Sequence, residues 1–462
     1  MNWPQLLLCM LPENLLLLGI ILLIGADIVQ ARPRGAQMIS LLAVLGAAFG
    51  AAWLGLGGYG GNPFPGHFSV TSQEFLAKAA ILGMAVPVLL ISRDDFGDTG
   101  PFYPLLLSSL YGFSLLVSSD SFLTLFLGVE IMSLPVYVLV LLAFQRHSAI
   151  EAALKYIVLG GAATATLLMG ASLLYGATGS MALGAFAQAA GSADALAITG
   201  VVLVFAGLYI KAAVVPFHAW APDAYEAATI PVTAHMSVII KAGVLLAALR
   251  TFGDAALSPV LAGVLMAPPL LSILWGNLAA MRQDGLRRML AYSSIAHAGY
   301  LFYAFLGVAD GRFEAVVFYL LSYGVMNLMA FAALPPGGDD AQRDGLERLK
   351  GLFQRDPRSA ILIGVAMLSL AGIPPLPGFI GKFLIFQNVM AAGHTTVAVL
   401  GLVGSYLGIY FYLRVIQVMF MSEPSSAAHI APPGGAGKLA TTLCVAAAAA
   451  LAIFPGWFLS FF

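Results

Sequence analysis

Long apolar stretches recur along the whole sequence, and they limit what the chain can fold into more than any other feature. Most of them run for about 17 residues or more, which lets a helix cross a hydrocarbon core about 30 Å thick. Charged residues make up only 9% of the 462 residues, compared with roughly 25% in soluble domains. We therefore expect a chain that crosses a membrane many times.

The apolar runs and the polar or proline-rich breaks between them predict an all-α polytopic membrane protein with about fourteen transmembrane helices. No basic segment precedes the first run and no small-residue cleavage site follows it, so we expect no removable signal peptide. The predicted spans are residues 15–28, 38–57, 75–91, 103–118, 122–144, 152–175, 197–220, 232–249, 259–281, 289–306, 313–334, 360–390 with an internal break, 397–420 and 440–454.

The distribution of Lys and Arg between the loops predicts the orientation, because short cytoplasmic loops are enriched in both. Even-numbered loops hold two of these residues, Arg250 and Arg312. Both termini are therefore expected in the periplasm, with the chain in the bacterial inner membrane. Odd-numbered loops hold thirteen: Arg32, Arg34, Arg93, Arg146, Arg282, Arg287, Arg288, Arg343, Arg348, Lys350, Arg355, Arg358 and Lys438.

The remaining Lys and Arg fall inside predicted spans, where a charge costs roughly 2.5–3.5 kcal/mol on insertion scales. Lysine can release its proton in a desolvated site, whereas arginine stays protonated. A row of buried lysines therefore favours proton transfer. Lys78 and Arg414 are close enough to span ends for us to expect that they reach the headgroups. The six residues are Lys78, Lys155, Lys211, Lys241, Lys382 and Arg414.

Glu130, Lys211 and Lys241 are the first candidates for a proton path. Glu130 lies in the middle of a predicted span, where it is either a structural counter-ion or a group that takes part in proton transfer. Lys211 comes shortly before Pro216, which removes a helix hydrogen bond. Lys241 has about ten residues of span on either side, too many for a lysine to reach the headgroups easily. For all three, proton transfer is the favoured interpretation.

Lys382 follows a segment that cannot be regular helix, because Pro374, Pro375 and Pro377 interrupt it. Non-helical backbone at membrane depth is tolerated where protein covers it or where it lines a cavity, and transporters place ion sites at such breaks. This break lies five spans after the one at Pro216. An odd offset inverts the topology, so the spacing predicts two inverted five-helix repeats, each with a broken helix.

The predicted organisation has four parts. Residues 1–98 form three N-terminal transmembrane helices, and residues 99–250 form the first antiporter-like repeat. Residues 251–422 form the second, inverted repeat, and residues 423–462 form a C-terminal transmembrane helix.

Several further residues are candidates for a supporting relay. Glu151 and Lys155 stand in the i,i+4 order that favours pairing, which can also be simple helix stabilisation. His218, His235 and His297 lie within or beside spans and can relay protons near neutral pH. Each histidine alone is more often a packed or hydrogen-bonded one.

No cofactor or metal is expected in this chain. Cys9 and Cys444 lie near opposite ends and outside any C-x-x-C spacing, which excludes a cysteine-ligated iron–sulfur cluster or structural zinc. The sequence also contains no motif for flavin or haem. Lipids are expected partners and nucleic acid is not.

Six motifs together with the opening Leu11-Pro12-Glu13 resemble the antiporter-like membrane subunits of the bacterial proton-pumping NADH:quinone oxidoreductase, respiratory complex I, and among them subunit N. The resemblance covers essentially the whole chain. The six motifs are LFLGVE at 125–130, SLP at 133–135, EAALKY at 151–156, VPFHAWAPD at 215–223, LAYSSIAH at 290–297 and GIPPLPGF at 372–379.

The resemblance implies roles for these residues. Glu130 and Lys211 would form an ion pair, Lys241 would be the central relay, and Lys382 would be the exit-side group. Sister subunit M usually has glutamate where Lys382 stands, and sister subunit L has a long lateral helix after its last spans; both differences favour subunit N.

The resemblance also implies a proton-translocating subunit without a redox centre of its own, which moves protons from cytoplasm to periplasm. NADH, FMN, iron–sulfur clusters and quinone would be bound by other subunits. The expected neighbours are another antiporter-like subunit and a small multi-helix subunit.

Two other interpretations remain open. A subunit of a multi-chain sodium/proton antiporter has similar helices and lysines, and sodium dependence of transport would distinguish it. A non-transporting membrane scaffold explains the buried lysines poorly, because a scaffold has no need for charges whose insertion into the membrane costs free energy.

Overall fold

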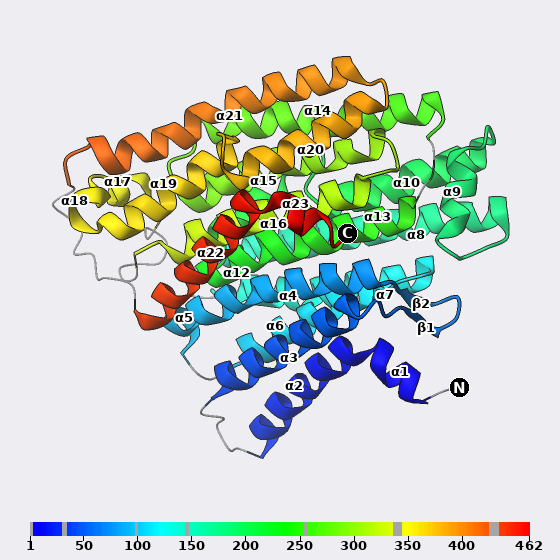
Figure 1. Ribbon diagram of the computed structural model, residues 1–462, viewed down its shortest axis with the longest axis horizontal. Coiled ribbons are helices and arrows are strands. Elements are labelled where there is room, and N and C mark those ends of the chain that lie inside the picture. The colour runs from blue at the N-terminus through cyan, green and yellow to red at the C-terminus, as the bar shows by residue number, and fades with distance from the viewer. Residues whose placement is uncertain are drawn as a thin grey trace.

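The helices of the computed structural model run roughly side by side, so that their ends gather at two opposite ends of the molecule (Figure 1). The structure describes residues 3–29, 35–97, 100–143, 147–253, 255, 257–335, 344–424 and 434–462. Four arginines used in the orientation argument, Arg32, Arg34, Arg146 and Arg343, lie outside these ranges.

The first part of the chain forms an outer layer of the bundle. Helices α2 and α3 pack on each other at the lower edge in Figure 1. The two strands between α3 and α4 are antiparallel. The elements are α1 (Trp3–Cys9), α2 (Leu11–Ile28), α3 (Ala36–Leu56), β1 (Gly61–Phe64), β2 (Phe68–Val70), α4 (Ser72–Ile91) and α5 (Arg93–Phe96).

The middle of the chain contains the longest helix and the first broken one. Helix α8 spans 32 residues and packs closely on α10. A π-helical segment, η1, lies directly before Lys241. The elements are α6 (Phe102–Val117), α7 (Phe122–Leu141), α8 (His147–Thr178), α9 (Gly184–Ala190), α10 (Ala195–Lys211), α11 (Trp220–Ala227), α12 (Ile230–His235), η1 (Met236–Ile240) and α13 (Lys241–Phe252).

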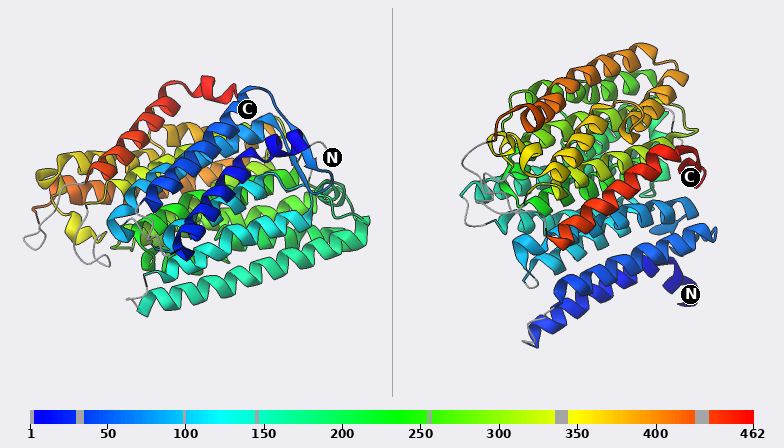
Figure 2. Two further views of the ribbon diagram at one scale, coloured as in Figure 1. Left: turned by 90° about the horizontal axis from the view of Figure 1, so that it is seen from below. Right: turned by 60° about the vertical axis from the view of Figure 1, so that its left-hand side comes forward.

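The last part of the chain contains the second broken helix and returns to the first layer. Helix α22 runs obliquely across α4 and α16 and contacts both (Figures 1 and 2). The elements are α14 (Pro259–Ala280), α15 (Leu286–Tyr303), the 3-10 turn η2 (Ala304–Leu306), α16 (Arg312–Ala332), α17 (Leu346–Leu349), α18 (Leu352–Arg355), α19 (Pro357–Ala371), α20 (Pro377–Ala391), α21 (Thr395–Met421), α22 (Gly435–Ile453) and α23 (Pro455–Leu459).

The predicted all-α membrane class is confirmed. Each predicted span coincides with a helix or with successive helical segments. Among the described residues, ten helices are long and apolar enough to cross a membrane, and three shorter apolar ones lie at Phe102–Val117, Ala195–Lys211 and Pro357–Ala371.

Both predicted breaks are present. Helix α10 ends at Lys211 and regular helix resumes at Trp220, with a cis bond between Val215 and Pro216 in the gap. Helix α19 ends before Gly372, which adopts the left-handed conformation (φ 87°) that glycine tolerates at helix C-termini. A cis bond joins Pro374 to Pro375, and α20 begins at Pro377.

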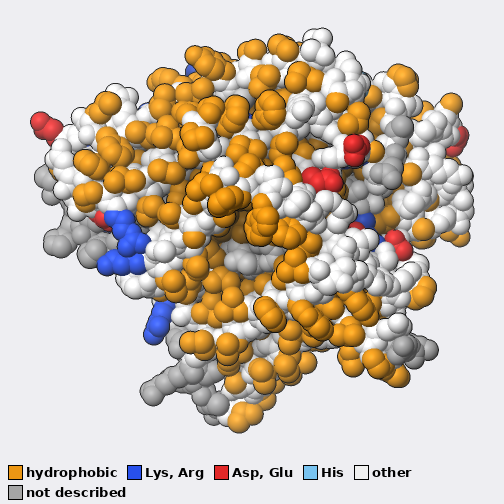
Figure 3. Space-filling model, viewed as in Figure 1, with side chains coloured by type: hydrophobic (Ala, Val, Ile, Leu, Met, Phe, Trp, Pro, Cys, Tyr) orange, Lys and Arg blue, Asp and Glu red, His pale blue; other side chains and the backbone are white. Residues whose placement is uncertain are grey.

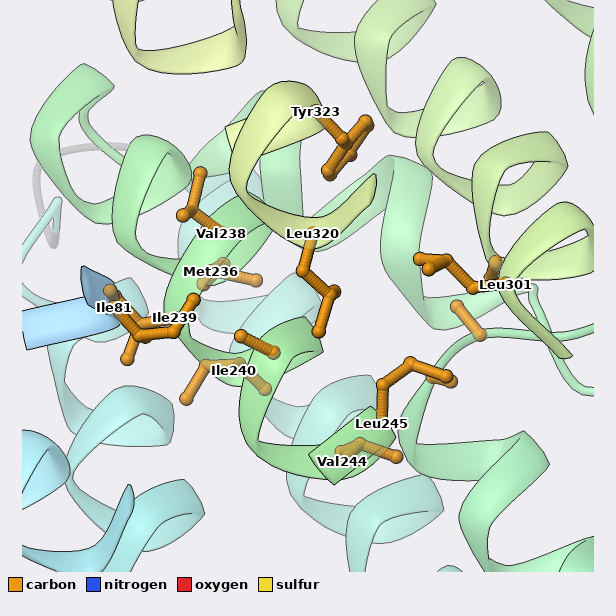
Figure 4. Packing of buried hydrophobic residues seen from close by; sticks show 14 of the residues in the cluster. Ile81, Met236, Val238, Ile239, Ile240, Val244, Leu245, Leu301, Leu320 and Tyr323 are labelled. Atoms are coloured by element: carbon orange, nitrogen blue, oxygen red, sulfur yellow. The ribbon is translucent and has the colours of Figure 1, made fainter. Parts of the chain in front are cut away.

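The helices that carry the central lysine and its neighbours are the most deeply buried. In the segment from α12 to α13, and likewise in α16, every residue of an 18-residue stretch is buried. In α2 only 28% of the residues of such a stretch are buried. Figure 4 shows apolar residues of η1, among them Met236 and Ile239, packed between Ile81 of α4 and Leu320 of α16. Lys241 therefore starts its helix inside an apolar shell.

The outer surface matches the membrane prediction. Hydrophobic side chains cover the face along the helices, and the Lys and Arg side chains visible there gather mainly toward the end where α5 and α18 lie (Figures 1 and 3). Large apolar side chains point outward on the peripheral helices, for example Phe49 of α3 and Tyr406 of α21, each 75% exposed. Such exposure suits contact with lipid chains.

Candidate functional site

Glu130 and Lys211 form an ion pair between α7 and the end of α10. Lys211 Nζ lies 3.1 Å from Glu130 Oε1 and also donates to the hydroxyl of Tyr137 at 3.1 Å. The hydroxyl of Thr164 on α8 donates to the same carboxylate oxygen. The Lys211 side chain is 4% exposed and that of Glu130 19%. This is the pair that the resemblance implies. Because the pair is largely buried, replacing only one partner would leave an uncompensated charge and destabilise the protein.

Lys241 is buried among neutral hydrogen-bond acceptors. Its ammonium donates to the backbone oxygen and the hydroxyl of Ser294 on α15. It also lies over the ring of Tyr323, 5.7 Å from the centroid, within the range of a cation–π contact. In the described part of the chain no carboxylate pairs with it. Lys241 can therefore lose its proton without leaving an anion unpaired.

One face of α15 continues from Lys241 toward Lys382. His297 lies one turn after Ser293 and Ser294, and its two ring nitrogens lie 2.8 Å from the hydroxyl of Tyr319 and 3.1 Å from that of Tyr412. Imidazole can accept a proton at one nitrogen and release one at the other. His297 is thus placed to exchange protons with the hydroxyls of Tyr319 and Tyr412.

Lys382 lies at the second helix break, and its ammonium is held there by backbone and hydroxyl oxygens. Its ammonium donates to the backbone oxygens of Leu370 at 2.9 Å and Ala371 at 3.2 Å, which are the last carbonyls of α19. It donates to Ser405 at 3.0 Å and lies over the ring of Tyr300, 5.1 Å from the centroid. Carbonyls at a helix C-terminus carry partial negative charge, so the break itself provides the site for the cation.

The other two histidines have different surroundings. His235 is fully buried on α12 and lies 2.9 Å from the hydroxyl of Ser109. His218 lies in the first break and accepts a hydrogen bond from the indole of Trp275 at 2.8 Å. His235 is one helix segment before Lys241, whereas His218 is half-buried near the surface of this chain.

Glu151 and Lys155 pair as their spacing predicts, at 2.7 Å, but not at a buried position. The Lys155 side chain is 44% exposed and also pairs with Asp223 of α11 at 2.8 Å. Asp223 in turn pairs with Arg288 of α15 at 2.9 Å. Glu151, Lys155 and Asp223 line a surface pocket together with Glu226.

The expectation that Lys78 reaches the headgroups is wrong. Lys78 is 0% exposed and pairs with Glu13 of α2 at 2.5 Å, and it also donates to Ser118 at the end of α6. Arg414 is 30% exposed and pairs with Asp284 at 2.7 Å. Its position fits the expectation of a span-end arginine.

Sequence reasoning missed the neutral partners of Lys241 and His297, which are Ser294, Tyr319 and Tyr412. Ser294 is part of the LAYSSIAH motif, but the motif alone does not indicate its hydrogen bond with Lys241. Tyr412 lies more than a hundred residues from His297 in sequence, and no local pattern reveals such a contact. Among the described residues no group of three or more His, Cys, Asp or Glu side chains is placed to hold a metal ion.

The chain matches the family model described as NADH:quinone oxidoreductase/Mrp antiporter, TM, over residues 119–408. NADH-quinone oxidoreductase subunit N of Pelobacter propionicus is 37% identical over 90% of this chain and 89% of that protein. A second relative, NADH-quinone oxidoreductase subunit N 1 of Sorangium cellulosum, is 41% identical over 81% of this chain and 78% of its own length.

Solved structures of membrane complexes also contain chains similar to this one. A chain of respiratory complex I from Thermus thermophilus superimposes with a TM-score of 0.84 at 34% identity, over 97% of this chain and 98% of that one. A chain of the Mrp complex from Dietzia superimposes with a TM-score of 0.82 at 23% identity, over 100% of this chain and 96% of that one. The second likeness extends to the fold alone.

Proposed function

Since this chain belongs to the NADH-quinone oxidoreductase subunit N family, whose members are antiporter-like membrane subunits of a respiratory complex, we propose that it carries protons across the membrane along one buried glutamate and three buried lysines. The residues are Glu130, Lys211, Lys241 and Lys382.

The observation that carries this proposal is the kind of partner that Lys241 and Lys382 have. Lys241 and Lys382 are 4% and 6% exposed and donate to hydroxyl and carbonyl oxygens. A permanent structural cation at this depth would be expected to pair with a carboxylate, because an unpaired buried charge is costly. Lysines held by neutral acceptors can instead alternate between a charged and a neutral form.

The proposed cycle starts at the Glu130–Lys211 pair. When Glu130 moves away, Lys211 loses its stabilising anion, which disfavours its charged form. Lys241 is neutral at this stage, because it has already passed its own proton toward Lys382, so it can accept another. The proton then leaves Lys211 for Lys241, through water or the intervening hydroxyls. From there it passes along Ser294 and His297 toward Lys382. The serine and the histidine each accept one proton and release another, so they end the transfer unchanged.

Quinone reduction in other subunits would supply the energy. Each charge that crosses works against about 2.3 kcal/mol per 100 mV of membrane potential. We propose transfer from the cytoplasm to the periplasm of the bacterial inner membrane, with both termini periplasmic. NADH, FMN, iron–sulfur clusters and quinone would bind elsewhere in the complex.

The proposal also includes the organisation and the supporting groups. The two inverted repeats would be residues 99–250 and 251–422, beside an N-terminal unit at 1–98 and a C-terminal helix at 423–462. Glu151, Lys155, His218 and His235 would support the relay. Another antiporter-like subunit and a small multi-helix subunit would be the neighbours.

The comparison of Glu130→Gln with Glu130→Asp tests the proposed switch. Glutamine keeps the size of the side chain and removes the charge, whereas aspartate keeps the charge on a shorter side chain. Proton pumping by the assembled complex is expected to fall much further in Glu130→Gln than in Glu130→Asp. The measurement is quinone-coupled acidification of inverted membrane vesicles, normalised to the amount of complex. Equal pumping in the two variants would argue against a charge-dependent switch.

A further inference from the structure

A second buried Glu–Lys pair lies outside the row described above. Glu13 of α2 is 1% exposed and Lys78 of α4 is 0% exposed, and their charged atoms are 2.5 Å apart. The hydroxyl of Ser114 donates to the same Glu13 oxygen at 2.7 Å, and Lys78 donates to Ser118 at 2.5 Å. We propose that Glu13 and Lys78 form a further proton-transfer site, which connects His235 with the end of the bundle where α2 and α4 begin. This inference rests on the proposed function.

The pair has the chemistry that a transfer site needs. When a proton arrives at Glu13 Oε2, one O–H bond forms and the carboxylate becomes a neutral acid. Lys78, left without its anion, then releases a proton from Nζ toward Glu74, so one N–H bond breaks and a neutral amine remains. Transfer of the Glu13 proton to Nζ restores the ion pair. A charged pair taken out of water is expensive, so the neutral form is accessible there. The second Glu13 oxygen, Oε2, is buried and has no hydrogen-bond partner within the described ranges. It is an acceptor for an incoming proton.

Helix α6 connects this pair to the central row. Ser109 of α6 lies 2.9 Å from His235, which is six residues before Lys241. Ser114 is bonded to Glu13, and Ser118 at the end of the same helix is bonded to Lys78. Ser114 follows Ser109 by five residues, which is about 7.5 Å along the helix axis and about 140° around it. A step of that length requires bridging water.

Helix α4 continues the path from Lys78 to the molecular surface. Glu74 lies one turn before Lys78 and pairs with Arg250 of α13. Arg250 lies 3.5 Å from Asp120, whose side chain is 38% exposed. Arg250 keeps its own proton and positions Glu74, so the carboxylates of Glu74 and Asp120 are the groups that can pass a proton toward solvent. Their end of the bundle is the end assigned to the periplasm by the distribution of loop arginines, so the site is placed for proton release.

A double variant separates proton transfer from structural support. Glu13→Gln with Lys78→Met removes both charges, so neither partner is left as an unpaired buried charge. If the pair transfers protons, the complex assembles but its quinone-coupled pumping falls severalfold. If the pair only supports packing, the double variant pumps at the wild-type rate, and the proposal is wrong.

Lys78→Arg is the second, independent variant. Arginine keeps the positive charge and can bond Glu13, but it does not release its proton. Pumping per assembled complex is expected to fall in this variant as well, and full pumping would overturn the proposal. Ser114→Ala should lower pumping more than Ser40→Ala. Ser40 is an equally buried serine of α3 that bonds a carbonyl of its own helix, so it serves as the matched control.

A parallel measurement on Lys241→Met keeps this inference distinct from the proposed function. Lost pumping in Lys241→Met together with normal pumping in the Glu13/Lys78 double variant would contradict only the proposed role of the Glu13–Lys78 pair. Normal pumping in Lys241→Met would contradict the proposed function itself.

Discussion

Replacement of Lys241 by methionine is expected to stop proton transfer through this subunit while the complex still assembles. Methionine has a similar length and fills the apolar shell formed by η1 and α16, so packing is retained. The proton carrier between Lys211 and Ser294 is lost. A positioned acid–base group accelerates proton transfer about 10²–10⁴-fold, so quinone-coupled pumping should fall to a small fraction of the wild-type rate.

Vesicle acidification driven by quinone reduction measures this effect, normalised to assembled complex. Lys350→Met is the matched control, because Lys350 is 39% exposed and pairs with Glu347 only at the surface. The control is expected to pump normally. A Lys241→Met complex that assembles and pumps like the control would exclude Lys241 as a relay.

The second large effect is expected on stability, from Arg287→Met. Arg287 is the first basic residue of α15 and is fully buried. Its guanidinium donates to the backbone oxygen of Ala228 at 2.5 Å and to Asp344 at 2.9 Å. Without it, Asp344 is left as an unpaired buried charge, which costs about 3–5 kcal/mol. That is a large part of the roughly 5–15 kcal/mol that stabilises a typical folded domain.

The amount of assembled complex in the membrane, and its thermal inactivation, measure the loss. Arg358→Met is the control, because the exposed Arg358 makes only long hydrogen bonds, such as one of 3.2 Å to Thr442. Such surface contacts contribute about 0–1 kcal/mol. Asp344→Leu added to Arg287→Met should restore part of the stability, since no charge then remains unpaired. Wild-type stability in Arg287→Met alone would contradict this account.

Local patterns in the sequence predicted the spans and both helix breaks well. Apolar runs and prolines determine these features without long-range contacts, as at Pro216 and Pro374. The Glu151–Lys155 pair follows from i,i+4 spacing alone. The motifs also indicated Glu130 and Lys211 as partners, although these residues are 81 positions apart.

Contacts between distant helices could not be predicted in this way. The distance of Lys78 from its span end favoured a headgroup contact, whereas its burial depends on Glu13, which lies 65 residues earlier in the sequence. Asp223, the second partner of Lys155, is 68 residues away. The π-helical turn before Lys241 likewise depends on the packing around it, since the MSVII segment carries no local signal for it.

The most direct test of the central claim is the number of protons translocated per quinone reduced in vesicles containing the Lys241→Arg variant. Arginine keeps the positive charge and can donate hydrogen bonds to Ser294, but it holds its proton permanently. A lysine that takes up and releases protons predicts a complex that assembles and translocates fewer protons than the wild type. The wild-type number of protons per quinone in this variant would show that Lys241 supplies only charge, and it would contradict the account.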